Sequence, residues 1–143
     1  PRCGFFFSGG PKGGAGVRAP QTARFWWVNP RAERHQGDWA LPAGFVENDE
    51  GPVQAALREL SEETGLIGRI RGIVGTFHIR SDARGPIVTI LYHARIVGGE
   101  LKAGDDAEEV RFFTPEELPR NLAFASTRQA LHRWLRLEKP DLA

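Results

Sequence analysis

Three glutamates, Glu59, Glu62 and Glu63, lie close together in the stretch "RELSEE". On a helix, carboxylates three and four residues apart are neighbours and repel one another. Two unit charges about 5 Å apart repel by roughly 3 kcal/mol at an effective dielectric constant near 20. A divalent cation accounts for such a cluster, because Mg²⁺ prefers hard oxygen ligands and often binds substrate phosphates at the same time. The stretch therefore predicts a metal site, with an ordinary solvated acidic face as the alternative.

The residues around the glutamates predict one helix with defined ends. Pro52 suits the first helical position, Gly51 is an acceptable N-cap, and Gly65 suits the left-handed position that ends a helix. Arg58 lies within reach of Glu62 and of the preceding Glu50. The expected buried stripe, set by the helical period, consists of Val53, Ala56, Leu57 and Leu60. The glutamates lie on a second face, so the helix can present them away from the core.

The remaining elements favour an α/β fold. Hydrophobic and β-prone runs predict strands over 13–17, 24–28, 70–80, 87–97 and 110–113, and a last helix over 126–137. Residues 81–86 resemble a hairpin loop, and residues 98–109 are expected to form a polar loop. Strands on both sides of a helix, followed by a closing helix, suggest a mixed β-sheet sandwiched between helices.

The spacing of the acidic stretch resembles a known signature. From Gly44, five residues lead to Glu50, seven more lead to Arg58-Glu59-Leu60, and Glu62-Glu63, Thr64 and Gly65-Leu66 follow. This pattern matches the signature of the MutT/Nudix hydrolases at every fixed position. The resemblance implies the Nudix fold, an α/β/α sandwich around a mixed sheet, in which this segment forms a loop–helix–loop.

The same resemblance implies roles for the matching residues. Glu59, Glu62 and Glu63 should hold Mg²⁺, or Mn²⁺ as an alternative ion, together with a backbone carbonyl around Gly44. Glu59 would also orient or deprotonate the attacking water. Arg58 and Glu50 would fix the metal-binding carboxylates from behind.

A further acid usually comes from a loop beyond this segment. The loop "AGDDAEEVRFF" contains Asp105, Asp106, Glu108 and Glu109. Counting back from the aromatic pair favours Asp106, so the expected catalytic set is Glu59, Glu62 and Asp106. A solvated acidic loop is the alternative interpretation of these residues.

The implied activity is hydrolysis of the diphosphate linkage in a nucleoside diphosphate derivative, so the protein is expected to be an enzyme. The tail "LAFASTRQALHRWL" resembles a bacterial group described as ADP-ribose pyrophosphatases, which favours ADP-ribose or a related nucleotide sugar. Hydrolysis of NADH or other dinucleotides, hydrolysis of oxidised or normal nucleoside triphosphates, and a non-catalytic nucleotide-binding module remain alternatives. Phe45, Trp39 and Phe124 are candidates for stacking on the base, with a core role as the alternative for Phe124.

Composition limits the other classes of function. The chain has 143 residues, a formal net charge of +1 and one cysteine. This near-neutral balance argues against nucleic-acid binding, and no apolar run suits a membrane span. A cytoplasmic location is expected, with a nucleotide-derived substrate as partner and a homodimer as an assembly that the resemblance allows. The start "PRCG" resembles half of a zinc knuckle, or a plain loop cysteine, so residues 1–12 are interpreted as a lead-in and 13–143 as the Nudix domain.

Overall fold

The computed structural model describes residues 12–18, 25–30, 38–79, 86–104, 107–113, 117–122, 128–129 and 131–132. Cys3, and with it the proposed zinc-ribbon remnant, lies outside these residues. So do Asp105, Asp106 and Phe124, and most of the last helix expected over 126–137. Within the described part of the chain, no helix is long and apolar enough to cross a membrane.

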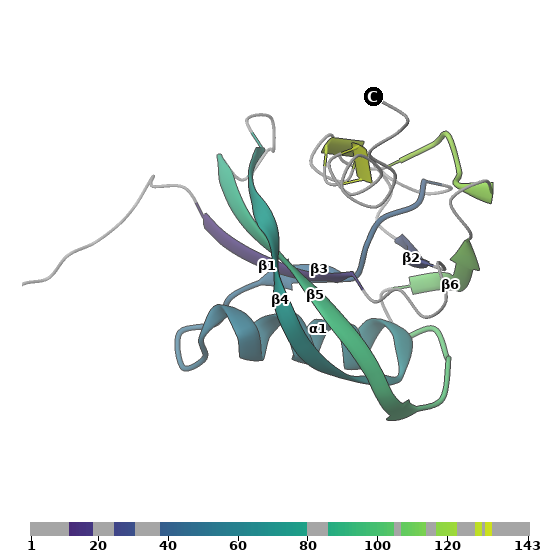
Figure 1. Ribbon diagram of the computed structural model, residues 1–143, viewed down its shortest axis with the longest axis horizontal. Coiled ribbons are helices and arrows are strands. Elements are labelled where there is room, and N and C mark those ends of the chain that lie inside the picture. Colours follow the sequence, from purple (N-terminus) through teal and green to yellow (C-terminus); the bar gives the residue numbers. More distant parts are fainter. Residues whose placement is uncertain are drawn as a thin grey trace, which may run out of the picture.

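The strands form a four-stranded mixed sheet and a separate two-stranded one. The larger sheet has the order β3-β1-β5-β4, with β1 (Lys12–Arg18) parallel to β5 (Ile87–Gly99) and antiparallel to β3 (Ala43–Phe45). Strands β4 (Leu66–Ile79) and β5 pair as a long antiparallel ribbon, and β2 (Phe25–Pro30) pairs with β6 (Ala107–Phe113). Figure 1 shows the smaller sheet beside the larger one. The predicted α/β fold with a mixed sheet is confirmed.

The one long helix among the described residues, α1 (Pro52–Thr64), has the ends that the sequence predicts. Gly51 is the N-cap in an extended conformation, and Pro52 opens the helix. Gly65 ends it at φ 72°, in the left-handed region that glycine adopts without a Cβ penalty. Both ends follow from local backbone preferences, which explains why sequence alone located them.

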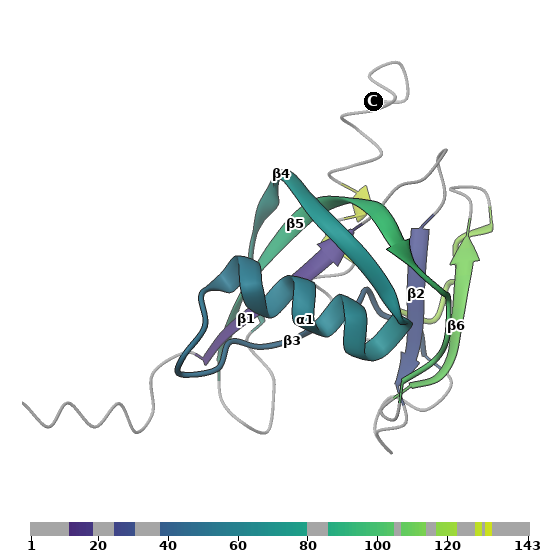
Figure 2. The same cartoon turned by 90° about the horizontal axis from the view of Figure 1, so that it is seen from below.

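The helix packs on one face of the larger sheet (Figure 2). Its fully buried residues are Ala55, Ala56, Leu60 and Thr64, and they form a core with Leu66, Tyr92 and Ala94. Burying a side chain such as Leu60 contributes about 1.5–3 kcal/mol. The prediction that Val53 belongs to the buried stripe is wrong, because Val53 is 38% exposed and lies outside this core. Compared with the predicted stripe, the face of α1 that the sheet covers is therefore shifted toward Ala55 and Thr64.

The opposite face of the sheet carries a second core. Leu91 alternates with Tyr92 along β5 and therefore points to the other side. It packs with Trp39, Leu41, Phe77 and Phe113, and Leu131 from the helical residues near the C-terminus lies against this cluster. Two cores on opposite faces match the sandwich expected from the sequence.

The strand limits differ from the expected ones. Strand β4 begins at Leu66, directly after the C-cap of α1, and β5 continues to Gly99. Strand β6 begins at Ala107, so the expected polar loop over 98–109 is reduced to the segment between these strands. Where a strand ends depends on its pairing with another strand, so the polar residues at the end of the β4–β5 ribbon do not reveal that they are paired.

Candidate metal and active site

The site is built on the loop that leads from β3 into α1. Glu50 lies at the end of this loop, and one of its carboxylate oxygens accepts a hydrogen bond from the Glu47 N–H at 3.0 Å. The same carboxylate accepts from Arg58 on α1, at 2.6 Å from Nη2 and 3.1 Å from Nε. The Arg58 Nη2 also donates to the Phe45 carbonyl at 3.0 Å. Glu50 and Arg58 therefore fasten the loop to the helix.

Arg58 also contacts two of the candidate metal ligands. Its Nη1 donates to Glu59 at 2.8 Å and to Glu62 at 3.1 Å. Hydrogen bonding to Glu50 raises the pKa of Arg58 further above its already high value. The Arg58 guanidinium in turn holds the pKa of the Glu50 carboxyl below its usual value, and the Glu47 N–H adds to this effect. Arg58 thus stays charged and orients several acids at once.

Glu59 occupies the tightest position in the site. Its carboxylate lies against the Cα of Gly44, where an added Cβ would overlap with it. Burial raises the pKa of Glu59 above its usual value, although hydrogen bonding to Arg58 acts in the opposite direction. Glu59 is therefore an acid whose negative charge is not fully compensated by the residues around it.

Glu62 and Glu63 lie in the last turn of α1. One carboxylate oxygen of Glu63 accepts a hydrogen bond from the Ala43 N–H at 3.0 Å, which ties the helix to β3. The side chain of Glu62 is 59% exposed. The last turn has no basic residue, and the C-terminal end of a helix carries a partial negative charge. Both effects favour a cation at this end.

The carboxylates do not converge on one point in this arrangement. Within the described residues, no three acidic, histidine or cysteine side chains are grouped closely enough to hold a metal ion. The contacts give the reason, since Arg58 binds Glu59 and Glu62 while the Ala43 N–H binds Glu63. The donor set nevertheless fits a divalent cation, because it offers hard oxygens around an incompletely compensated Glu59.

The aromatic candidates have different surroundings. Phe45 is partly buried at the end of β3, and its own carbonyl accepts the hydrogen bond from Arg58. Trp39 was expected to be surplus to the core, but it is only 8% exposed and packs edge-on against Phe113, with ring centroids 4.9 Å apart. The Arg111 guanidinium lies 5.7 Å from the ring centroid of Trp39. The ring of Trp39 is thus largely committed to packing.

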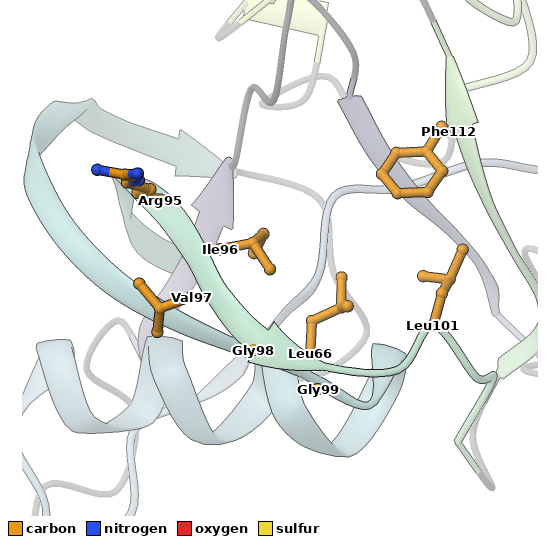
Figure 3. Close-up of a pocket in the computed structure, with 8 residues that line it drawn as sticks. All are labelled: Leu66, Arg95, Ile96, Val97, Gly98, Gly99, Leu101 and Phe112. Carbon is orange, nitrogen blue, oxygen red and sulfur yellow. The ribbon is translucent and has the colours of Figure 1, made fainter.

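One groove among the described residues lies away from the glutamates. It has a volume of about 610 Å³ and is lined mainly by apolar residues from β5 and its neighbours, among them Leu66, Ile96, Val97, Leu101 and Phe112, with Arg95 (Figure 3). None of the candidate metal ligands lines it. The groove is therefore distinct from the carboxylate site.

Sequence reasoning missed two backbone contributions to the site. The Ala43 N–H has no side-chain signature, and its contact with Glu63 depends on how β3 lies beside α1. Gly104 lies against the backbone of Glu62 and Glu63, and its only signal was a glycine in a loop that was expected to be merely polar.

Comparison with known proteins agrees with this architecture. A family model described as the NUDIX domain matches residues 13–135. The ADP-ribose pyrophosphatase of Methanocaldococcus jannaschii is 46% identical over 90 residues, which cover 62% of this chain and 53% of that protein. The putative mutator protein MutT4 of Mycobacterium tuberculosis is 33% identical over 119 residues, covering 80% of this chain and 48% of that protein. The chain thus spans about half the length of these two relatives.

Solved structures show the same fold. A NUDIX hydrolase from Nitrosomonas europaea superposes with a TM-score of 0.80 at 28% identity, over 93% of this chain and 73% of that one. A MutT NUDIX hydrolase from Burkholderia pseudomallei gives a TM-score of 0.79 at 26% identity, over 87% of this chain and 98% of that one. With the family match covering most of the chain, and with the complete signature folded as loop–helix–loop, this protein belongs to the NUDIX domain family.

Proposed function

We propose that the protein is a divalent-metal-dependent hydrolase of the diphosphate linkage in nucleoside diphosphate derivatives, with ADP-ribose or a related nucleotide sugar as substrate. The observation that carries this proposal is the set of contacts made by Arg58, which binds Glu50, Glu59 and Glu62 along one side of α1. The 46% identity to an ADP-ribose pyrophosphatase supports the choice of substrate.

Glu59, Glu62 and Glu63 would hold the ion, together with a backbone carbonyl near Gly44. A bound divalent ion neutralises charge on the diphosphate oxygens and polarises water. The chain's own groups then position the acids, since Arg58 orients Glu59 and Glu62 and the Ala43 N–H orients Glu63. These five residues would act together as one unit.

Hydrolysis requires an acceptor for the proton of water. The water oxygen forms a bond to one phosphorus, the bond from that phosphorus to the bridging oxygen breaks, and the proton of water passes to a carboxylate. A carboxylate with a raised pKa is a better base than an ordinary one, which favours Glu59. Asp106, which lies outside the described residues, remains the alternative base on the loop.

The base candidates are separable by mutation. Asp106→Asn should lower kcat more than it raises KM if Asp106 acts in the transition state. Glu109→Gln is the matched control, because Glu109 pairs with Arg111 at 2.7 Å. Mild effects in both variants would leave Glu59 as the base.

A nucleoside triphosphate is the second candidate substrate, because the match to the ADP-ribose pyrophosphatase covers only 62% of this chain. The deciding experiment is a screen with Mg²⁺ of ADP-ribose, NADH, diadenosine polyphosphates, and normal and oxidised nucleoside triphosphates, with products separated by chromatography. We expect AMP and ribose 5-phosphate from ADP-ribose. Turnover only of triphosphates would overturn the choice of ADP-ribose.

A pair of variants distinguishes turnover by this protein from turnover by contaminating enzymes. Glu59→Gln should abolish turnover, whereas Asp49→Asn should not, because Asp49 is exposed and occupies no fixed position of the signature. Absence of turnover with every substrate, in a folded protein with bound metal, would favour the non-catalytic nucleotide-binding alternative.

The nucleoside would stack on an aromatic ring beside the diphosphate. Phe45 is the described candidate with a partly exposed ring, and Phe124 lies outside the described residues. Stacking on an aromatic ring is worth roughly 1–3 kcal/mol, so replacing the correct ring with alanine should raise KM about tenfold or more. Trp39→Ala should instead mainly lower the melting temperature, because Trp39 is in the core.

A further inference from the structure

The segment that follows β5 caps the end of the helix that carries the glutamates. The last four carbonyls of a helix have no partner within the helix. Here the Lys102 N–H donates to the Thr64 carbonyl at 2.9 Å, and the Gly104 N–H donates to the Glu63 carbonyl at 3.1 Å. Figure 3 shows this segment leaving Gly99 and passing through Leu101 beside the end of α1. A distant part of the chain thus supplies the cap.

Gly104 makes the closest approach in this segment. A Cβ at Gly104 would overlap with the Glu62 carbonyl oxygen, and it would lie 3.0 Å from the Glu62 carbonyl carbon and 3.3 Å from the Glu63 Cα. These are backbone atoms of a helix, so they cannot rotate out of the way. The positive-φ glycines of the described chain are Gly65 and Gly99, so Gly104 is required for space and not for an unusual backbone conformation.

The contact lies under two of the proposed metal ligands. The backbone of Glu63 is held by Gly104, and its carboxylate is held by the Ala43 N–H at 3.0 Å. Glu62 lies beside it, with its carbonyl directly against Gly104. A shift of the segment would therefore displace the last turn of α1, and both acids would move with it.

We propose that Gly104 is a positioning residue for metal binding, which holds the last turn of α1 so that Glu62 and Glu63 can turn their carboxylates toward one ion. Gly104 itself touches neither the metal nor the substrate. The inference rests on the part of the proposed function that assigns a divalent ion to these acids, and it is independent of which nucleotide is hydrolysed.

The test is metal affinity without substrate. Mn²⁺ is titrated into the purified protein, and free Mn²⁺ is followed by electron paramagnetic resonance. Loss of a residue that orients metal ligands typically weakens affinity by 10–100-fold, so Gly104→Ala should bind Mn²⁺ at least about tenfold more weakly. Gly98→Ala is the matched control, because a Cβ there makes only ordinary contacts of 3.7 and 3.9 Å with Ile67. It should bind Mn²⁺ as the wild type does.

A second control removes general destabilisation as an explanation. Phe77→Leu perturbs the core on the other face of the sheet and should lower the melting temperature without weakening Mn²⁺ binding. Equal weakening in Phe77→Leu and Gly104→Ala would overturn the inference, as would wild-type affinity in Gly104→Ala. Wild-type protein that binds no Mn²⁺ would overturn the proposed metal site as well. Wild-type protein that binds Mn²⁺ but hydrolyses none of the substrates would overturn only the proposed activity.

A measurement on the wild type covers the case in which Gly104→Ala does not fold. If the cap favours metal binding, then metal binding must strengthen the cap by the same factor, because coupling between two sites is reciprocal. Hydrogen exchange of the Lys102 and Gly104 amides should therefore slow about tenfold or more at saturating Mg²⁺. The Ala94 amide in the sheet serves as a reference. Unchanged exchange at both capping amides would overturn the inference.

Discussion

Replacing Gly44 with alanine should separate catalysis from folding. In β3, the added Cβ would lie 2.7 Å from Oε2 of Glu59 and would overlap with the other carboxylate oxygen, whereas ordinary contacts begin at 3.4 Å. Oε2 alone must therefore retreat by 0.7 Å, and the closer carboxylate oxygen must retreat further. The obstacle is the end of a flexible side chain, so the free energy of unfolding should fall by only about 1 kcal/mol, equivalent to about 3–4 °C in melting temperature.

The effect on turnover should be much larger. A misplacement of about 1 Å in a reacting group can reduce the rate by about 10²-fold, so kcat/KM at saturating Mg²⁺ should fall by roughly that factor. The assay is steady-state kinetics with the substrate that the screen identifies, beside thermal unfolding of the same samples. Gly72→Ala is the control, because a Cβ there meets no atom within 4 Å. A Gly44→Ala variant within threefold of wild-type kcat/KM would refute the assigned position of Glu59.

Three further variants and one pH experiment test the rest of the site. Arg58→Lys keeps the charge but loses the planar fork, so kcat should fall by about tenfold or more; unchanged kinetics would remove Arg58 from the positioning role. Glu62→Gln should lower activity by orders of magnitude at limiting Mg²⁺, while the melting temperature without metal should hold or rise as repulsion is relieved; unchanged turnover would exclude Glu62 as a ligand. The Leu66 N–H donates a hydrogen bond to the Thr64 hydroxyl at 3.2 Å, and Thr64→Val removes this acceptor. Urea unfolding should therefore show a free energy of unfolding that is lower by about 1–3 kcal/mol, whereas Thr64→Ser should retain the bond. Because the pKa of Glu59 is raised above 4.5 in the folded protein, protonation of Glu59 favours the folded state. Without metal, the free energy of unfolding should therefore contain a contribution that declines as the pH rises from about 4.5 through the raised pKa. The Glu59→Gln variant should lack this contribution.

The sequence by itself determined the helix, its ends and the set of acids that lies off its buried stripe. These features are local, because Gly51, Pro52 and Gly65 act through backbone preferences of a few residues and Arg58 reaches Glu62 within one helical turn. The spacing of the signature also identified the family, which the family match confirms. The two β-prone runs, with turn residues between them, were enough to predict a hairpin, and the antiparallel pairing of β4 with β5 confirms it.

Tertiary structure decided which of these residues are buried and what holds them. Val53 has the correct helical period but is exposed, because burial depends on where the sheet meets α1. Trp39 resembled a free aromatic residue but is in the core, because Phe113 from β6 packs against it. Backbone groups of Ala43 and Gly104 orient the last turn of α1, and they come from segments far away in the sequence. Contacts of this kind leave no periodic or compositional signal, since a backbone N–H is the same in almost every residue and only the fold determines which atom it meets.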